Sequence, residues 1–344
     1  MRTPHTFIGG IGSFIPELVS VKSAVEQGLS PAENMTEHEL EGAAVAGEIP
    51  APEMGLRAAR KAIERSGANP EDMGLLLYAS SWHQGPLGWL PHTYLQHYLL
   101  GGESLAVEVR QGCSGMFAAL ELGAGYLQSS SGTQDVLLVA ADNFGTPSAN
   151  RWLMGHEFVH GDAASALVLT TEPGFAQLLS VSSQSIPEGE VLARGGQPLF
   201  PPDVSGDAPA LSERFAKAFA TPDPELEADL SSALDQVAGT IKHIADRTLA
   251  EAGIGLDDIT CVSFINCSRS AVERRCMEPL GIPMSKAIWD FGVRIGHCGP
   301  SDQVLDLEHL VMNKRLAPGD YMLMFGGAPG FLFSAAIIKI LDVP

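Results

Sequence analysis

One cysteine of this sequence lies in a turn that favours nucleophilic chemistry. In the stretch EVRQGCSGMFAALELGAGYL, Cys113 stands between a strand-like and a helix-like segment, and Gly112 and Gly115 permit a tight turn. The thiol is therefore expected at the N-terminus of a helix, where free N–H groups and the helix dipole favour the nucleophilic thiolate. The alternative is that Cys113 is a small buried apolar residue, as free cysteines commonly are. The Gly-Cys-Ser-Gly turn after a strand favours the nucleophile.

A nucleophilic cysteine needs a base, and the stretch IGHCGPSDQ offers one in His297. Ser301 is expected to cap the helix SDQVLDLEHLVM, which places Asp302 in its first turn. Across the intervening Gly-Pro turn, Asp302 can fold back to accept the imidazole N–H and fix its tautomer. Taken alone, the pair could equally be a structural hydrogen bond; a partnership with Cys113 makes it a catalytic base and its orienter.

The adjacent His297 and Cys298 also suggest a metal or redox site, which the rest of the sequence does not support. Adjacent side chains splay apart in most backbone conformations, and the five cysteines include no CxxC pair. We therefore expect no metal site, no disulfide framework and no permanently bound cofactor. His83 and His160 precede turns, and without a visible partner each is interpreted as a polar tip of a loop.

A glycine-rich turn near the C-terminus is a candidate oxyanion site. In MFGGAPGFLFSAAII, the backbone at Gly327, Ala328 or Gly330 can approach a ligand closely and supply an N–H. Together with the N–H of Cys113, such a group would stabilise a tetrahedral intermediate. Glycine-rich turns are common, so this assignment depends on the cysteine.

The elements that must position these residues follow an α/β pattern. Apolar runs typical of buried strands alternate with helical stretches in which apolar residues recur every three or four positions. The strands are expected at residues 73–80, 104–110, 135–142, 163–170, 261–266, 320–327 and 333–341, with a further strand-like segment at 286–295. The helices are expected at residues 54–67, 114–129 and 230–253.

A faint internal repeat divides the chain into two halves. A helix that ends at Gly67, an acidic turn and a strand recur after Gly253 in the same order. We predict a first half at residues 1–175, carrying Cys113, and a second at 176–344, carrying His297 and Asp302. Residues 195–225 are rich in Pro, Gly and Asp and are expected to form an insertion or cap loop.

Composition excludes several classes of function. The net charge of −20 opposes binding to nucleic acid, and no apolar run is long enough for a membrane span or a signal peptide, so a cytoplasmic protein is expected. The stretch SRSAVERR gathers Arg269, Arg274 and Arg275 in an otherwise acidic chain. They form either a docking patch for an acidic partner or a solvated helix face.

These motifs, taken in order and spacing along nearly the whole chain, resemble the thiolase-fold ketoacyl-ACP synthase III family. The resemblance implies two duplicated five-stranded mixed-sheet halves in a five-layered αβαβα arrangement, and a homodimer. It implies that Cys113 is the nucleophile at the head of a buried helix, that HGDAASALVL stands where the family has FGDGAAAVVL, and that acyl-CoA or acyl-ACP is the thioester donor. Residues of the family's gating segment and substrate pocket then correspond to Trp82, His83, Leu90 and Cys267.

Two departures from that family bear on the reaction. Condensing members carry a histidine in PHQAN and an asparagine in GNTS, whereas this chain has Cys267 at the first position and His297 at the second. Because the missing His/Asn pair stabilises the enolate formed on decarboxylation, the remaining Cys-His-Asp set resembles instead the synthase III-like acyltransferases of antibiotic pathways. The condensing members' TRTGIxxR segment is also absent from residues 25–60.

The sequence thus predicts an acyltransferase of polyketide or antibiotic biosynthesis that acts through a Cys113 thioester. The acceptor would be the hydroxyl of a small molecule or a carrier-protein thiol, and Arg269, Arg274 and Arg275 would dock an acidic carrier protein. A decarboxylating condensing enzyme that uses the relocated histidine is the first alternative. A non-catalytic partner subunit of a synthase is the second.

Overall fold

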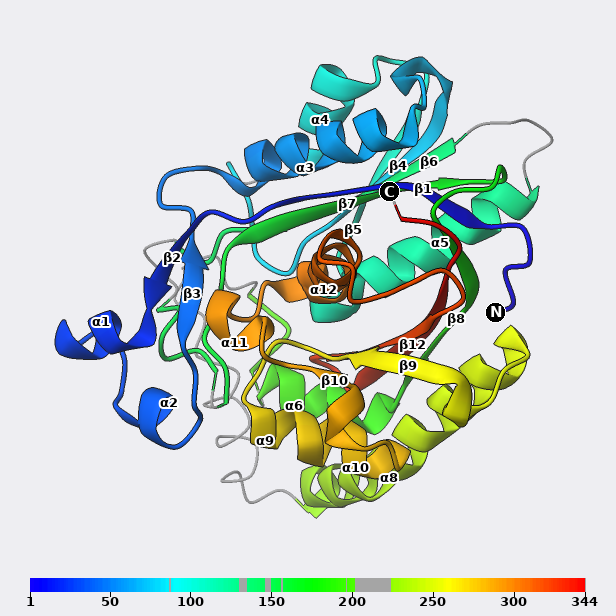
Figure 1. Cartoon of the computed structure of the whole chain (residues 1–344). Coiled ribbons are helices and arrows are strands. Elements are labelled where there is room, and N and C mark those ends of the chain that lie inside the picture. The colour runs from blue at the N-terminus through cyan, green and yellow to red at the C-terminus, as the bar shows by residue number, and fades with distance from the viewer. Residues whose placement is uncertain are drawn as a thin grey trace.

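A computed structural model describes residues 1–86, 88–129, 135–145, 150–155, 157–195, 197–201 and 224–343. Ten strands form a mixed sheet made of two five-stranded halves, in the order β5-β4-β6-β7-β1 and then β8-β12-β11-β9-β10 (Figure 1). Read outward from the junction of β1 with β8, both halves use their strands in the same order along the chain. The strands are β1 (Phe7–Phe14), β4 (Met73–Ala79), β5 (Leu105–Val109), β6 (Asp135–Asp142), β7 (Ala163–Thr170), β8 (Ala176–Ser185), β9 (Ile259–Ser263), β10 (Ala287–Ile288), β11 (Tyr321–Ala328) and β12 (Leu332–Ile340).

Helices cover the outer faces of the two half-sheets and fill the space between them. Helix α3 packs on β1, β7 and β6, and α8 packs on β8 and β12, while α5 and α12 contact strands of both halves. This is the five-layered αβαβα arrangement of the thiolase fold, with α5 and α12 as its central layer (Figure 1). The helices are α1 (Val21–Glu26), α2 (Glu33–Thr36), α3 (Ala51–Ser66), α4 (Pro91–Leu99), α5 (Gly115–Ser129), α6 (Glu190–Arg194), α8 (Pro224–Ala252), α9 (Arg269–Val272), α10 (Glu278–Leu280), α11 (Gly292–Ile295) and α12 (Asp302–Met312).

The strand sequences follow from this layering. Every residue of β4 and of β7 is buried, because helices or strands cover both faces of each. Their continuous apolar runs are typical of strands that never face water. A separate hairpin of β2 (Glu17–Ser20) and β3 (Gly42–Val45) lies beside α11.

The internal repeat predicted from the sequence is confirmed. Helix α3 is followed by Gly67 at φ 67°, a 3-10 turn at Pro70–Asp72 and β4. Helix α8 is followed by Gly253 at φ 75°, a 3-10 turn at Leu256–Asp258 and β9. Glycine ends both helices because these positive φ angles strain any residue with a Cβ.

Two expectations need correction or restriction. The strand-like segment 286–295 forms only the two-residue β10 and then turns into α11. Gly292, the first residue of α11, lies against Asn266 with room for no side chain: a Cβ would come 2.4 Å from Asn266 Oδ1. The boundary predicted after residue 175 falls immediately before β8, and residues 202–223 of the predicted insertion lie outside the described residues. Among the described helices, none is long and apolar enough to cross a membrane.

The close contact of β1 with α3 yields a stability prediction. A Cβ on Gly12 would lie 2.3 Å from Ala58 O, whereas a Cβ on Gly125 of α5 would meet no atom within 4 Å. We expect Gly12→Ala to destabilise the fold by about 1–3 kcal/mol, because backbone must shift to admit the methyl group. Gly125→Ala should leave stability unchanged or raise it by up to about 1 kcal/mol. Denaturant unfolding measures both; equal midpoints for the two variants would contradict this packing.

Candidate active site

Cys113 occupies the turn that the sequence predicts. After β5, the chain forms a 3-10 turn at Gly112–Ser114 and enters the buried helix α5. Gly112 has φ 54°, and Gly115 lies so close to Ala79 that a Cβ would come within 3.0 Å of that side chain. The turn thus delivers a partly exposed thiol to the N-terminus of a helix at the centre of the molecule.

The structure brings Cys113, His297 and Asp302 together in one chain of contacts. Cys113 Sγ lies 2.9 Å from His297 Nε2, and His297 Nδ1 lies 2.5 Å from Asp302 Oδ2. His297 is 2% exposed and Asp302 is fully buried. Because the carboxylate can only accept at Nδ1, the imidazole must present Nε2 to the sulfur.

Asp302 is held in the first turn of α12, as expected, although the cap differs. Ser301 belongs to a preceding 3-10 turn, and its hydroxyl donates to Ala140 O at 3.2 Å instead of capping the helix. The carboxylate of Asp302 also accepts hydrogen bonds from Asn266 N at 2.7 Å, Asn266 Nδ2 at 3.1 Å and Cys298 N at 2.7 Å. These donors compensate a charge that has no access to water.

Two glycines allow the backbone that carries His297 to lie against a second segment. His297 N donates to Val159 O at 2.8 Å, and Gly161 N donates to His297 O at 3.0 Å. A Cβ on Gly161 would lie 2.0 Å from Ile295 O, and one on Gly296, at φ 78°, would lie 2.8 Å from Val159 O. Both glycines are required by this close approach of the two segments. The approach positions the imidazole relative to the thiol.

His160 is a part of the site that the sequence reasoning missed. The residue is 9% exposed, stacks on Phe144 at 4.2 Å between centroids, and has its ring 5.4 Å from that of His297. Interpreting it as a loop tip was therefore wrong. The partners that bury it come from residues remote in sequence, and the only available signal was the imidazole at the position where the resembling motif has phenylalanine.

The pKa values of the two histidines are shifted in opposite directions. Burial disfavours the charge on His297, but the negative charges of Cys113 and Asp302 and its hydrogen bonds to both outweigh burial and hold its pKa well above the ordinary value. Burial, together with the charge on His297, lowers the pKa of His160 to about 3. His297 is therefore the protonated partner of the thiol, and His160 is a neutral ring beside that of His297.

A buried carboxylate anchors the start of the predicted gate. Asp142 accepts hydrogen bonds from Ser81 N at 2.9 Å and Trp82 N at 2.8 Å, and a Cβ on Gly299 would lie 2.8 Å from its Oδ2. Burial raises the pKa of Asp142 to about 7, while those backbone N–H groups oppose the rise. Asp142 thus contacts both the segment beginning at Trp82, through hydrogen bonds, and the turn that follows His297, through close packing against Gly299.

The other predicted gate and pocket residues lie in different surroundings. His83 is exposed, with Nε2 3.0 Å from Gly85 O, and Leu90 is 50% exposed just before α4. Cys267 is 1% exposed among the apolar residues of the second half, and burial raises its pKa above the ordinary range. Cys267 therefore supplies neither a charge nor an open thiol face.

The glycine-rich turn lies beside the cysteine turn, as the oxyanion assignment requires. A Cβ on Gly112 would be 3.3 Å from Pro329 Cδ and 3.4 Å from Ala328 Cβ. The turn between β11 and β12 also places Gly330 at φ 91°. Gly327, Ala328 and Gly330 thus belong to the segment that borders Cys113.

The predicted arginine patch is partly engaged within the chain. Arg274 donates to Glu157 at 2.6 Å, Arg275 also pairs with Glu157, and Arg269 pairs with Glu273 at 3.4 Å. The Glu157 side chain is only 7% exposed, while those of Arg274 and Arg275 are 57% and 43% exposed. One acidic side chain therefore offsets part of the charge of two outward-facing arginines.

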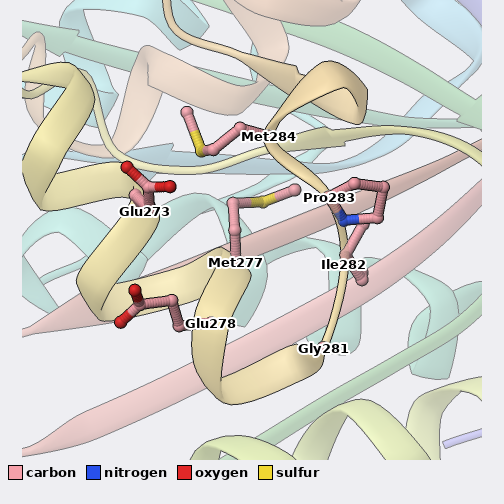
Figure 2. Close-up of a pocket in the computed structure, with 7 residues that line it drawn as sticks. All are labelled: Glu273, Met277, Glu278, Gly281, Ile282, Pro283 and Met284. Atoms are coloured by element: carbon pink, nitrogen blue, oxygen red, sulfur yellow. The ribbon is translucent and has the colours of Figure 1, made fainter.

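A surface hollow of about 340 Å³ lies next to this patch and is lined by Glu273, Met277, Glu278, Gly281, Ile282, Pro283 and Met284 (Figure 2). Neither Cys113 nor His297 is among its lining residues. Among the described residues, no cluster of His, Cys, Asp and Glu has the arrangement of a metal site.

Comparison with known proteins agrees with this fold. The profile of 3-oxoacyl-[acyl-carrier-protein] synthase III matches residues 107–186, and that of its C-terminal domain matches residues 249–340. A solved structure named ChlB3 [Aceyltransferase] is 49% identical, with a TM-score of 0.93 over 98% of both chains. The chain belongs to the ketoacyl-ACP synthase III-like family.

More distant members share the fold and carry another name. A beta-ketoacyl-[acyl-carrier-protein] synthase III of Rhizorhabdus wittichii is 26% identical over 82% of both chains. The 3-oxoacyl-[acyl-carrier-protein] synthase III of Aquifex aeolicus superposes with a TM-score of 0.75 at 17% identity, over 97% of this chain and 99% of that one. This protein is thus a synthase III-like enzyme of the acyl-transferring class.

The contact between Cys113 and His297 yields a pH prediction. Because the raised pKa of His297 keeps the imidazolium present through neutral pH, its positive charge lies beside the Cys113 sulfur throughout that range. We expect iodoacetamide to alkylate Cys113 at a rate nearly independent of pH between about pH 6 and about pH 8. In His297→Ala, the rate should fall about tenfold for each pH unit below the ordinary thiol value of about 8.5. Mass spectrometry of the Cys113 peptide measures both, and identical profiles would contradict the pairing.

Proposed function

We propose that this protein is an acyltransferase of secondary-metabolite biosynthesis, in a polyketide or antibiotic pathway. It would take an acyl group from acyl-CoA or acyl-ACP onto Cys113 and pass it to a hydroxyl or carrier-thiol acceptor. The observation that carries this proposal is the 2.9 Å contact of His297 Nε2 with Cys113 Sγ, with Asp302 behind the same ring. By analogy with the family, the enzyme would act as a cytoplasmic homodimer without a permanent cofactor.

In the first half-reaction, the Cys113 thiolate attacks the carbonyl carbon of the donor thioester. The N–H of Cys113 and one N–H from the turn at Gly327, Ala328 and Gly330 are the proposed donors to the oxyanion. The intermediate collapses as the C–S bond to the donor breaks, and His297 gives its proton to the departing thiolate. Acyl-Cys113 and a neutral His297 remain.

In the second half-reaction, His297 acts as the base. Nε2 removes the proton of the acceptor hydroxyl as its oxygen attacks the acyl thioester, and Asp302 stabilises the imidazolium that forms. Collapse releases the ester and restores the Cys113 thiolate beside protonated His297. Atoms and charges balance without a metal or redox partner.

The names of the curated relatives favour a second candidate, a condensing synthase. Decarboxylation needs two donors aimed at the thioester oxygen of the malonyl unit, to stabilise the enolate. At the position of the family's histidine stands Cys267, which is buried, and both N–H groups of the adjacent Asn266 side chain are used, by Asp302 and Gly296 O. Because neither Cys267 nor the Asn266 side chain offers a second donor beside His297, acyl transfer is the better supported reaction.

Intact-protein mass spectrometry tests the proposed acyl-enzyme. Incubation with a panel of acyl-CoA thioesters should add one acyl mass to the wild-type protein, because His297 Nε2 lies 2.9 Å from the attacking sulfur. Cys113→Ala should gain none, and Cys261→Ala, which removes a buried thiol outside the site, should gain as much as the wild type. An acylated Cys113→Ala protein would remove the cysteine from its role. Carbon dioxide released from a malonyl thioester, with no ester formed from an alcohol, would favour the condensing enzyme.

A further inference from the structure

The neutral ring of His160 has a hydrogen-bonding position that no protein group uses. Its Nδ1 lies 3.3 Å from the carbonyl oxygen of His297, which is an acceptor only. Nδ1 must therefore carry the hydrogen, and Nε2 is left with an accepting lone pair. Nε2 makes no hydrogen bond to another described residue.

The surroundings of this ring offer its acceptor no partner from the protein. His160 is stacked on Phe144, meets Phe158 edge-on at 5.1 Å between centroids, and is 9% exposed. Aromatic carbon offers no hydrogen bond to the lone pair, which is left for water or a ligand to satisfy. A phenylalanine would fill similar space without an acceptor, and phenylalanine is the residue of the resembling family motif at this position.

The ring of His160 lies close to that of His297, where the acceptor hydroxyl would react. Its ring lies 5.4 Å from that of His297 and inclined by 30° to it, and Phe158 contacts both rings. Protonation does not remove the lone pair, because the pKa of His160 lies at about 3. A small molecule whose hydroxyl is deprotonated by His297 would therefore have a fixed hydrogen-bond acceptor next to it.

We infer that His160 selects the acyl acceptor, by accepting a hydrogen bond at Nε2 from a second O–H or N–H group beside the hydroxyl that reacts. This inference rests on the proposed function and narrows it to acceptors with two neighbouring donor groups, such as polyols or amino alcohols. His160 takes no proton, since the proton of the reacting hydroxyl goes to His297. A lone alcohol or a simple thiol lacks the second donor and leaves Nε2 unpaired. In this way, a site that hydrogen-bonds a substrate group discriminates against analogues without that group.

A comparison of two small alcohols on preformed acyl-enzyme tests this role. Wild-type protein is loaded with whichever of acetyl-, butyryl- and benzoyl-CoA labels Cys113 fastest, and loss of the acyl mass is then timed with propane-1,2-diol or propan-1-ol. We expect the diol to remove the acyl group about 3- to 10-fold faster, the effect of one hydrogen bond. In His160→Phe the two alcohols should react at equal rates, each measured from the loaded enzyme.

A matched control comes from the other end of the central layer. His309 of α12 also stacks on a phenylalanine, Phe291, at 4.1 Å between centroids, so His309→Phe makes the same chemical change away from the thiol. This variant should keep the preference for the diol. Should His160→Phe not fold, His160→Gln, whose side-chain oxygen can accept a hydrogen bond, should keep part of that preference.

The outcomes separate this inference from the proposed function. A wild-type enzyme that is acylated but reacts equally with both alcohols would overturn the role of His160 alone. So would a His160→Phe protein that keeps the preference, or one whose loading is slowed as much as its transfer, since His160 would then serve only to position His297. A wild-type enzyme that no thioester acylates would overturn both proposals.

Discussion

The site depends on one buried charge, the carboxylate of Asp302. A carboxylate without access to water is strongly disfavoured unless donors surround it, and this one receives the imidazole N–H of His297 and three further N–H groups from Asn266 and Cys298. These donors come from the end of β9 and from the turn before α12, so compensation of the charge requires the two segments to meet. His297 is thereby fixed in tautomer and position before any substrate arrives.

The duplicated fold explains how a thiol in one half meets a base in the other. In the first half, the third strand of the half-sheet, β5, leads into a 3-10 turn and the central helix α5. In the second half, the third strand, β10, is followed by α11, a 3-10 turn and the central helix α12. The two turns touch: a Cβ on Gly115 would lie 3.4 Å from Pro300 Cβ. The N-terminus of α5 therefore presents Cys113 to the segment that carries His297, and a cysteine and a histidine 184 residues apart come into contact. One fold can host different reactions, which depend on the side chains that it places around such a junction.

Local patterns predicted the parts of this architecture that depend on local interactions. The continuous apolar runs of β4 and β7, the glycines after α3 and α8, and the turn at Cys113 each have a short-range physical cause that a sequence displays. The family resemblance then gave the layering and the partnership of Cys113 with His297, which no local pattern could supply.

Features that depend on distant contacts were not predictable in this way. Ser301 looks like a helix cap, but its hydroxyl turns to a carbonyl of β6. His160 looks like a loop histidine until Phe144, Phe158 and His297 surround it. The ion pairs of Glu157 with two arginines likewise join residues more than a hundred positions apart.

The central claim is that His297 and Cys113 form an ion pair that Asp302 supports, and the most direct measurement is the titration of His297 itself. Nuclear magnetic resonance of protein labelled with ¹⁵N-histidine, with the signal assigned by its loss in His297→Gln, reports whether each ring nitrogen carries a proton. The account predicts that both nitrogens of His297 are protonated at neutral pH, and that Cys113→Ala lowers the pKa, since it removes the largest charge that raises it. A His297 that titrates near its ordinary pKa of about 6.5, equally in both proteins, would contradict it.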